Sequence, residues 1–157
     1  MKFSTREDMP VPVEFVFDEL SRFDAIEEVA RERGVKLHRT DQLEGAGKGA
    51  SWEIAFRLRG KMRKLTAEVT RFERPEAVGL SGESSSFLIE TVILLTALSR
   101  TRTRLQVGLD IRPRTLGARL MLQSAKLGRS SLDRKFADRI SKQAKEISAR
   151  YEASGQA

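Results

Sequence analysis

The last third of the chain contains one long apolar stripe. From Ala118 to Tyr151, apolar and small residues recur at steps of three or four, which is the spacing of one face of an α-helix. The members of the stripe are Ala118, Met121, Ala125, Gly128, Leu132, Phe136, Ile140, Ala144, Ile147 and Tyr151. A single helix of this length has to bury its stripe against a broad apolar surface, and the sequence before it indicates that this surface is a sheet.

Between Val35 and Pro113 the apolar residues alternate with a period of two instead. The alternation is clearest in 51–58, where Trp52, Ile54 and Phe56 share one face, and in 102–112. A weaker strand at 1–7 comes first. Two short helices follow it, at 12–23 and 21–34, and the second is expected to bury Ile26, Val29 and Ala30.

This order keeps strands and helices apart, which favours the α+β class. We expect a curved antiparallel sheet of six to seven strands gripping the long C-terminal helix, with two short helices after the first strand. The 157 residues suit one domain with one sizeable core. We expect that domain to span residues 1–152, with 153–157 as a short tail.

Composition excludes several kinds of site. The chain has no Cys and one His, so disulfides, thiolate catalysis and a multi-His metal site are ruled out, and we expect neither a metal nor a cofactor. No window is apolar enough for a membrane span, and the first ten residues lack the apolar region of a secretory signal. The expected location is cytoplasmic, with peripheral association at the membrane left open.

The net charge of +7 is unevenly distributed. Residues 114–157 contain ten Lys and Arg against four Asp and Glu, which fits either an ordinary solvated helix face or an anionic partner. Leu116, Leu120 and Leu127 lie opposite the main stripe, where we expect the curled sheet or loops to cover part of them. Left exposed, they would form an amphipathic patch with cationic flanks, together with the basic turn at 57–64 that is expected at the same end of the sheet. An anionic membrane surface is therefore a candidate partner.

Other partners are less constrained by the sequence. Nucleic acid is disfavoured, because the few aromatic residues are not interleaved with the basic ones and no nucleic-acid motif is present. The sequence leaves the oligomeric state open between a monomer and a homodimer.

The stripe itself predicts where a ligand would bind. Its first half is small and its second half is bulky, so the helix should pack tightly at its C-terminal end and leave space near its middle. Gly128 is expected on the buried face, with the helix running straight through it. The predicted ligand-binding residues are Trp52, Ile54, Phe56, Ala67, Met121, Ser124, Ala125 and Gly128. Trp52 fits a core position better than a ligand platform.

Two titratable residues need a separate judgement. Glu90 interrupts an apolar strand, and the register of the hairpin around 98–103 decides which way it points. Facing inward it would be a candidate catalytic base, whereas facing outward, the energetically cheaper arrangement and the one we favour, it would be a surface residue. His38 is expected to face solvent.

The order of elements resembles the helix-grip fold of the START-like, or SRPBCC, superfamily, and within it the polyketide cyclase/dehydrase-like group. The segments that carry the resemblance are PVPVEFVFDELSRFDAIEE, GAGKGASWEIAFRLRG, TALSRTRTRLQVGLDIRP and the terminal helix. The resemblance implies a cavity between the concave sheet and the long helix, used for hydrophobic or amphipathic small molecules. No catalytic pattern of the family transfers residue by residue.

The predicted function is therefore binding or carriage of an apolar or amphipathic small molecule without a cofactor. A cofactor-independent enzyme of the cyclase/dehydratase type, and a membrane-surface or protein-interaction module, are the alternatives. The sequence names neither the ligand nor a reaction.

Overall fold

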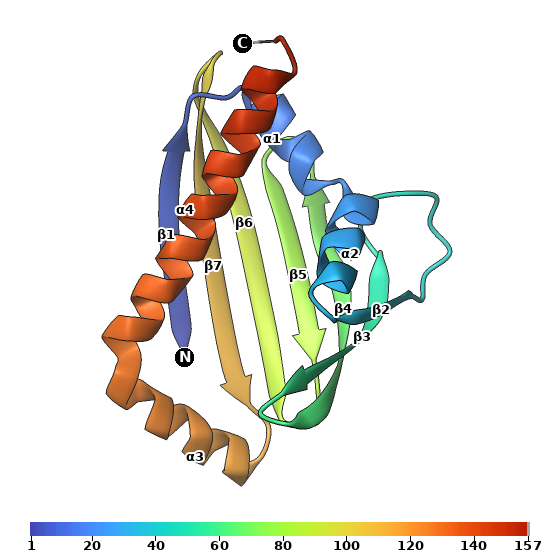
Figure 1. Ribbon diagram of the computed structural model, residues 1–157, viewed down its shortest axis with the longest axis vertical. Coiled ribbons are helices and arrows are strands. Elements are labelled where there is room, and N and C mark those ends of the chain that lie inside the picture. Colours follow the sequence, from blue (N-terminus) through green and yellow to red (C-terminus); the bar gives the residue numbers. More distant parts are fainter. Residues whose placement is uncertain (157) are drawn as a thin grey trace.

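A seven-stranded antiparallel sheet forms the body of the protein (Figure 1). The computed structural model describes residues 1–156. Its strands are β1 (Lys2–Met9), β2 (Lys36–Arg39), β3 (Ser51–Leu58), β4 (Lys61–Glu73), β5 (Ala77–Glu83), β6 (Phe87–Ser99) and β7 (Arg102–Pro113). The strand order is β1-β7-β6-β5-β4-β3-β2, so successive strands from β2 to β7 pair as neighbours and β1 joins at the edge beside β7. The predicted fold class is confirmed.

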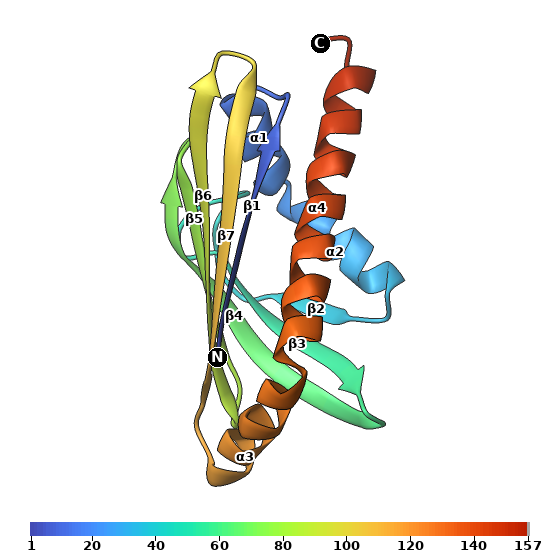
Figure 2. The same ribbon diagram turned by 90° about the vertical axis from the view of Figure 1, so that its left-hand side faces the viewer.

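The helices all lie on one side of the sheet, as the view in Figure 2 shows. They are α1 (Val13–Leu20), α2 (Phe23–Glu32), α3 (Leu116–Ala125) and α4 (Arg129–Ala153), with a 3-10 turn, η1 (Lys126–Gly128), between the last two. Thr115 caps α3, because its side chain accepts a hydrogen bond from the backbone N–H of Ala118 at 3.1 Å. Helix α4 packs chiefly along β1.

The main core lies at one end of the molecule, where β1 ends, β7 begins and α4 ends. We call this the upper end, as it is drawn in Figure 1, and the opposite end the lower end. Helix α1 contributes Val16 and Phe17, which are fully buried, and α4 contributes Ile147 and Tyr151. A second cluster joins Phe23 of α2 to the sheet residues Ala50, Trp52 and Val69.

The terminal helix is bent, which corrects the expectation that it runs straight through Gly128. Residues 126–128 form a 3-10 turn, and Gly128 is exposed rather than buried against the sheet. A Cβ atom at Gly128 would meet no other atom within 4 Å. A helix that stayed straight would leave the surface of the twisted sheet, so the bend lets α3 and α4 follow it separately.

Two local expectations are also corrected. Ile26 and Val29 are exposed, because α2 docks through Phe23 and Glu27 instead, with Glu27 accepting a hydrogen bond from the indole of Trp52. The β3–β4 turn, which the sequence pattern predicts at Gly60–Lys61, lies one residue earlier at Arg59–Gly60, with Leu58 paired to Lys61. Both turn residues have positive φ, 51° and 76°, as a type I′ hairpin turn requires.

Candidate functional site: the concave face of the sheet

The strand register defines which side chains face the helices. Trp52 packs edge-on against Phe23 of α2, with ring centroids 5.3 Å apart, so its side of β3 is the concave one. Alternation along β3 places Ile54 and Phe56 on the same side. Their partners on β4 face the same way, because directly paired residues share a face. These partners are Ala67, Leu65 and Arg63.

The concave face changes from closed to open along the molecule. On β7, Leu105 and Val107 are buried, whereas Leu109 and Ile111, nearer the lower end, are half-buried. On β6, Leu95 is buried and Ile89 is half-buried.

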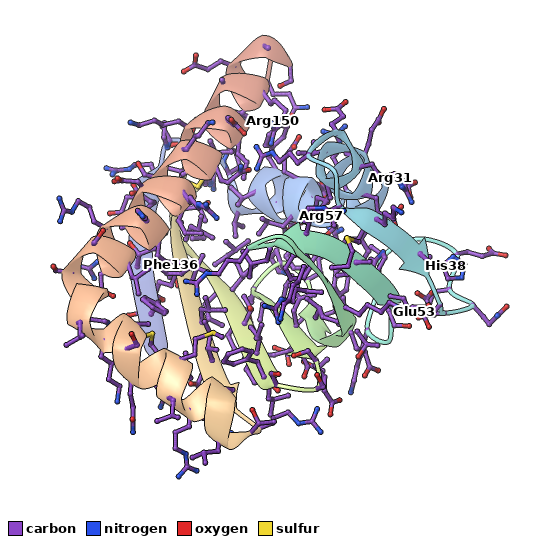
Figure 3. The ribbon with its side chains drawn as sticks, turned by 60° about the horizontal axis from the view of Figure 1, so that its bottom comes forward. Arg31, His38, Glu53, Arg57, Phe136 and Arg150 are labelled. Atoms are coloured by element: carbon purple, nitrogen blue, oxygen red, sulfur yellow. The ribbon has the colours of Figure 1, made fainter. Side chains whose placement is uncertain are left out.

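Helix α4 shows the same gradient. Ile147 and Tyr151 are buried, and Ile140, Phe136 and Leu132 are progressively nearer the lower end and half-buried. Figure 3 shows Phe136 on the side of α4 that faces the sheet. Apolar side chains that face inward and still reach solvent show that the helices cover this part of the concave face incompletely. We call this partly covered region, which lies toward the lower end, the concave groove.

Arg63 is the unusual residue of this face. It pairs with Phe56 and so projects into the concave groove among apolar neighbours. The residue is half-buried, its Nε atom is buried, and that atom has no hydrogen-bond partner among residues 1–156. Buried polar atoms are normally satisfied, so this donor is free to serve a molecule that is not part of the chain.

Arg63 was not among the residues that the sequence analysis singled out. The alternation that placed Leu65 and Ala67 inward also places Arg63 inward, two residues earlier in KMRKLTAEVT. The alternation of residues along this strand therefore predicts that Arg63 faces inward. The sequence analysis instead assigned Arg63 to the basic turn at 57–64.

The predicted binding residues have different surroundings. On the sheet side, Ile54, Phe56 and Ala67 are half-buried on the concave face. Trp52 is only 8% exposed, belongs to the second core cluster and donates its indole N–H to Glu27 at 2.6 Å. On the helix side, Ala125 is half-buried, while Met121, Ser124 and Gly128 are exposed.

Glu90 lies outside the concave groove. It pairs with Ser81 on β5 and with Asp110 on β7, whereas its neighbour Thr91 pairs with Leu109 and shares the concave face. Ser81 donates its hydroxyl to the carboxylate of Glu90 at 2.9 Å. A register shift between Ala97 and Ser99 sets this phase.

A separate cavity of about 600 Å³ lies against β2, β3 and β4. Much of its wall comes from residues whose side chains lie on the face of the sheet opposite the concave groove, including the paired residues His38 and Glu53. Arg114 also lines this cavity. His38 is exposed, and Figure 3 shows it beside Glu53 at the edge of the sheet. Of the predicted binding residues, Ile54 alone lines this cavity.

The loop that leads into β3 is held by Asp41. Arg39 donates to its carboxylate at 2.5 Å and 3.1 Å, and the backbone N–H groups of Leu43 and Ser51 each donate to it at 2.8 Å. These contacts, the Arg39 hydrogen bond first, hold the pKa of Asp41 well below its usual range. The guanidinium of Arg39 also lies over the Trp52 ring, 5.2 Å from its centroid.

A metal-binding cluster and a membrane-spanning helix are both absent from the described residues. Within residues 1–156, no group of three or more His, Cys, Asp or Glu side chains could hold a metal ion. No helix of that range has both the length and the apolar character needed to cross a bilayer.

Comparison with solved structures identifies the architecture. The Zhui aromatase/cyclase from Streptomyces sp. R1128 superimposes with a TM-score of 0.69 at 13% sequence identity, over 99% of this chain and 98% of that one. A START superfamily protein from Mycobacterium smegmatis gives a TM-score of 0.54 at 14% identity, over 85% and 95% of the two chains. The protein has the START-like helix-grip fold.

A further solved structure agrees with this architecture. A protein from Thermus thermophilus superimposes with a TM-score of 0.64 at 13% identity, over 96% of this chain and 99% of that one. No protein-family model matches the sequence, and no curated protein does. At such identities the helix-grip likeness describes the fold, and function has to be argued from this chain's own residues.

Proposed function

We propose that the protein binds an amphipathic small molecule, with an apolar body and an acidic head group, in the concave groove. The observation that carries the proposal is the buried, unpartnered Nε of Arg63, which lies on the concave face beside the apolar residues Phe56, Ile54 and Leu65. The surrounding side chains that would contact the apolar body are half-buried in the free protein. The helix-grip fold supports the same general kind of partner.

The chemistry of the guanidinium favours an acidic head. A planar guanidinium presents its N–H donors as a fork that matches a carboxylate or phosphate, and such charge-assisted hydrogen bonds are stronger than neutral ones. Leaving a buried donor unpaired costs about 1–3 kcal/mol, which a bound anion would recover. The apolar body would add about 25 cal/mol for each Å² of apolar surface removed from water.

The proposal is tested with a probe of this shape, anilinonaphthalene sulfonate, whose fluorescence rises in an apolar site. We expect it to bind the native protein and to be displaced by dodecanoate more effectively than by dodecanol. Arg63→Met should remove the preference for the acid over the alcohol, by about 10- to 100-fold, which is the range for a hydrogen bond to a charged group. The matched control is Arg57→Met, which removes an exposed arginine from the opposite face of the same hairpin.

Equal displacement by acid and alcohol in the native protein would contradict an anchoring role for Arg63. Absence of probe binding, with the fold intact by circular dichroism, would contradict the concave groove as a binding site. Native mass spectrometry of protein purified from its own host would then identify the natural ligand directly. A mass change when that ligand is returned to the protein would instead favour the enzymatic alternative.

A further inference from the structure

We infer that the lower end of the molecule docks on an anionic membrane surface, with the mouth of the concave groove facing the bilayer. The docking surface consists of the β3–β4 hairpin tip, 57–62, and the segment 114–127 that contains α3. Figures 1 and 2 both place these two segments at the lower end of the molecule. The inference rests on the proposed function. A protein that takes up and releases an amphipathic molecule needs a path between the membrane that dissolves the molecule and the concave groove that binds it.

Large apolar side chains are exposed on both parts of this surface. Leu127 is 92% exposed, Leu116 73% and Leu120 57%, although each is a residue that normally avoids water. On the hairpin tip, Leu58 and Met62 are about half exposed. A group of exposed apolar side chains at one end of a molecule marks a site of interaction with a partner or a membrane.

The two segments that form this surface carry charge of one sign. Residues 57–64 contain five Lys and Arg, of which all but Arg63 are exposed, residues 114–129 contain four, and neither segment contains an Asp or Glu. Arg114 and Arg129 are paired with Glu83 and Asp133. In these two segments, the exposed cations that have no ion pair with any of residues 1–156 are Arg57, Arg59, Lys61, Lys64, Arg119 and Lys126. Apolar side chains flanked by unpaired cations match the interface of an anionic bilayer.

Arg59 gives a further reason to assign this tip a role outside the fold. It has φ 51°, a left-handed conformation that a type I′ turn would normally give to Asn, Asp or Gly. A long cationic side chain at this position makes the hairpin less stable than Asn would. An arginine there supplies a positive charge at the point of the hairpin that projects furthest.

A bilayer fits these observations better than a second copy of the chain. A two-fold contact through this surface would bring the cations of both copies together, and like charges repel. An anionic lipid surface instead neutralises all of them and accepts the leucines.

Vesicle co-sedimentation tests the electrostatic part. We expect binding at low salt to vesicles of phosphatidylcholine mixed with phosphatidylglycerol, weakening at high salt, and no binding to phosphatidylcholine alone. Arg59→Asn with Lys61→Gln should weaken binding at least about tenfold, while the Asn-Gly pair should keep or improve hairpin stability. The matched control, Arg100→Gln with Arg102→Gln, removes two exposed cations from the upper end and should bind as the native protein does.

A second measurement tests the orientation. Because the chain has no cysteine, a fluorophore can be attached at one chosen position. Attached through Leu120→Cys or Leu58→Cys, it should shift to shorter wavelength and be quenched by a lipid-borne quencher when anionic vesicles are added. Attached through Leu98→Cys, an exposed leucine at the upper end, it should do neither.

The outcomes separate docking from ligand binding. Arg63→Met should still dock on vesicles, and the hairpin variants should still bind anilinonaphthalene sulfonate in solution. No binding at low salt, binding that ignores salt and lipid charge, or equal loss in the upper-end control would each overturn the docking inference. Equal labelling responses at Leu98 and Leu120 would overturn the orientation.

Discussion

At the scale of single residues, Asp41 joins the irregular loop 40–50 to the sheet. It accepts from two side-chain groups of Arg39 and from two backbone N–H groups, and Arg39 in turn covers Trp52. The lowered pKa of Asp41 means that its charged form is favoured in the folded state. Its contribution to stability is therefore fully present above its usual pKa of 3.8 and is lost as the pH falls below that value.

We therefore expect Asp41→Asn to lower the free energy of unfolding at pH 7, with the difference from the native protein shrinking as the pH falls below about 4. Urea unfolding at a series of pH values measures this difference. Asp138→Asn, an exposed change on α4, is the control and should have little effect. A difference that stays constant down to low pH would mean that the carboxylate charge is not what holds the loop.

At the scale of elements, the bent terminal helix determines which positions of the stripe are sensitive to size. Ala118 is 3% exposed and faces the sheet, whereas Gly128, on the same stripe, has open space where its side chain would be. The bend at 126–128 separates them.

We expect Gly128→Leu to change the free energy of unfolding by less than about 0.5 kcal/mol, as surface substitutions do, and to leave probe binding unchanged. Ala118→Leu, the matched change at a buried position, should destabilise by about 1–3 kcal/mol through overpacking. Thermal or urea unfolding distinguishes the two. If Gly128→Leu abolished probe binding, the terminal helix would have to lie closer to the sheet than its bent path places it.

At the scale of the whole molecule, stability should be graded from the upper end to the lower end. The upper end contains the large core cluster of β1, α1, β6, β7 and α4, whereas α3 buries one residue, Ala118. Segments with few buried apolar contacts open locally at much lower free energy than the core. The groove, its mouth and the docking surface therefore all belong to the less stable end.

Native-state hydrogen exchange should show this gradient. Amides of β7 near Leu105 are expected to exchange only through global unfolding, and those of α3 through local opening at rates at least about 100-fold faster. Amides of α4 near Ile147 serve as the internal control, because that side chain is buried in the same core. Uniform protection along α3 and α4 would show that the two helices form one cooperative unit.

The amino-acid sequence by itself determined the class, the element order and the inward faces of the strands. Binary patterns fix these features locally, since a strand with apolar residues at every second position has only one face to bury. That is why Ile54, Phe56 and Ala67 lie on the concave face, and why Arg63 could have been placed there in advance.

Only the tertiary structure decided the direction of Glu90, the bend at Gly128 and the docking of α2. Glu90 depends on a one-residue register shift between Ala97 and Ser99, and a shift of one residue moves every following side chain to the other face. Gly128 and Ile26 each belong to an apolar stripe. Such a stripe shows which side of a helix can be buried, but it does not show how much of the helix's length the sheet covers. The reach of a curved sheet depends on its twist and on contacts between distant strands, and no local pattern of residues specifies these.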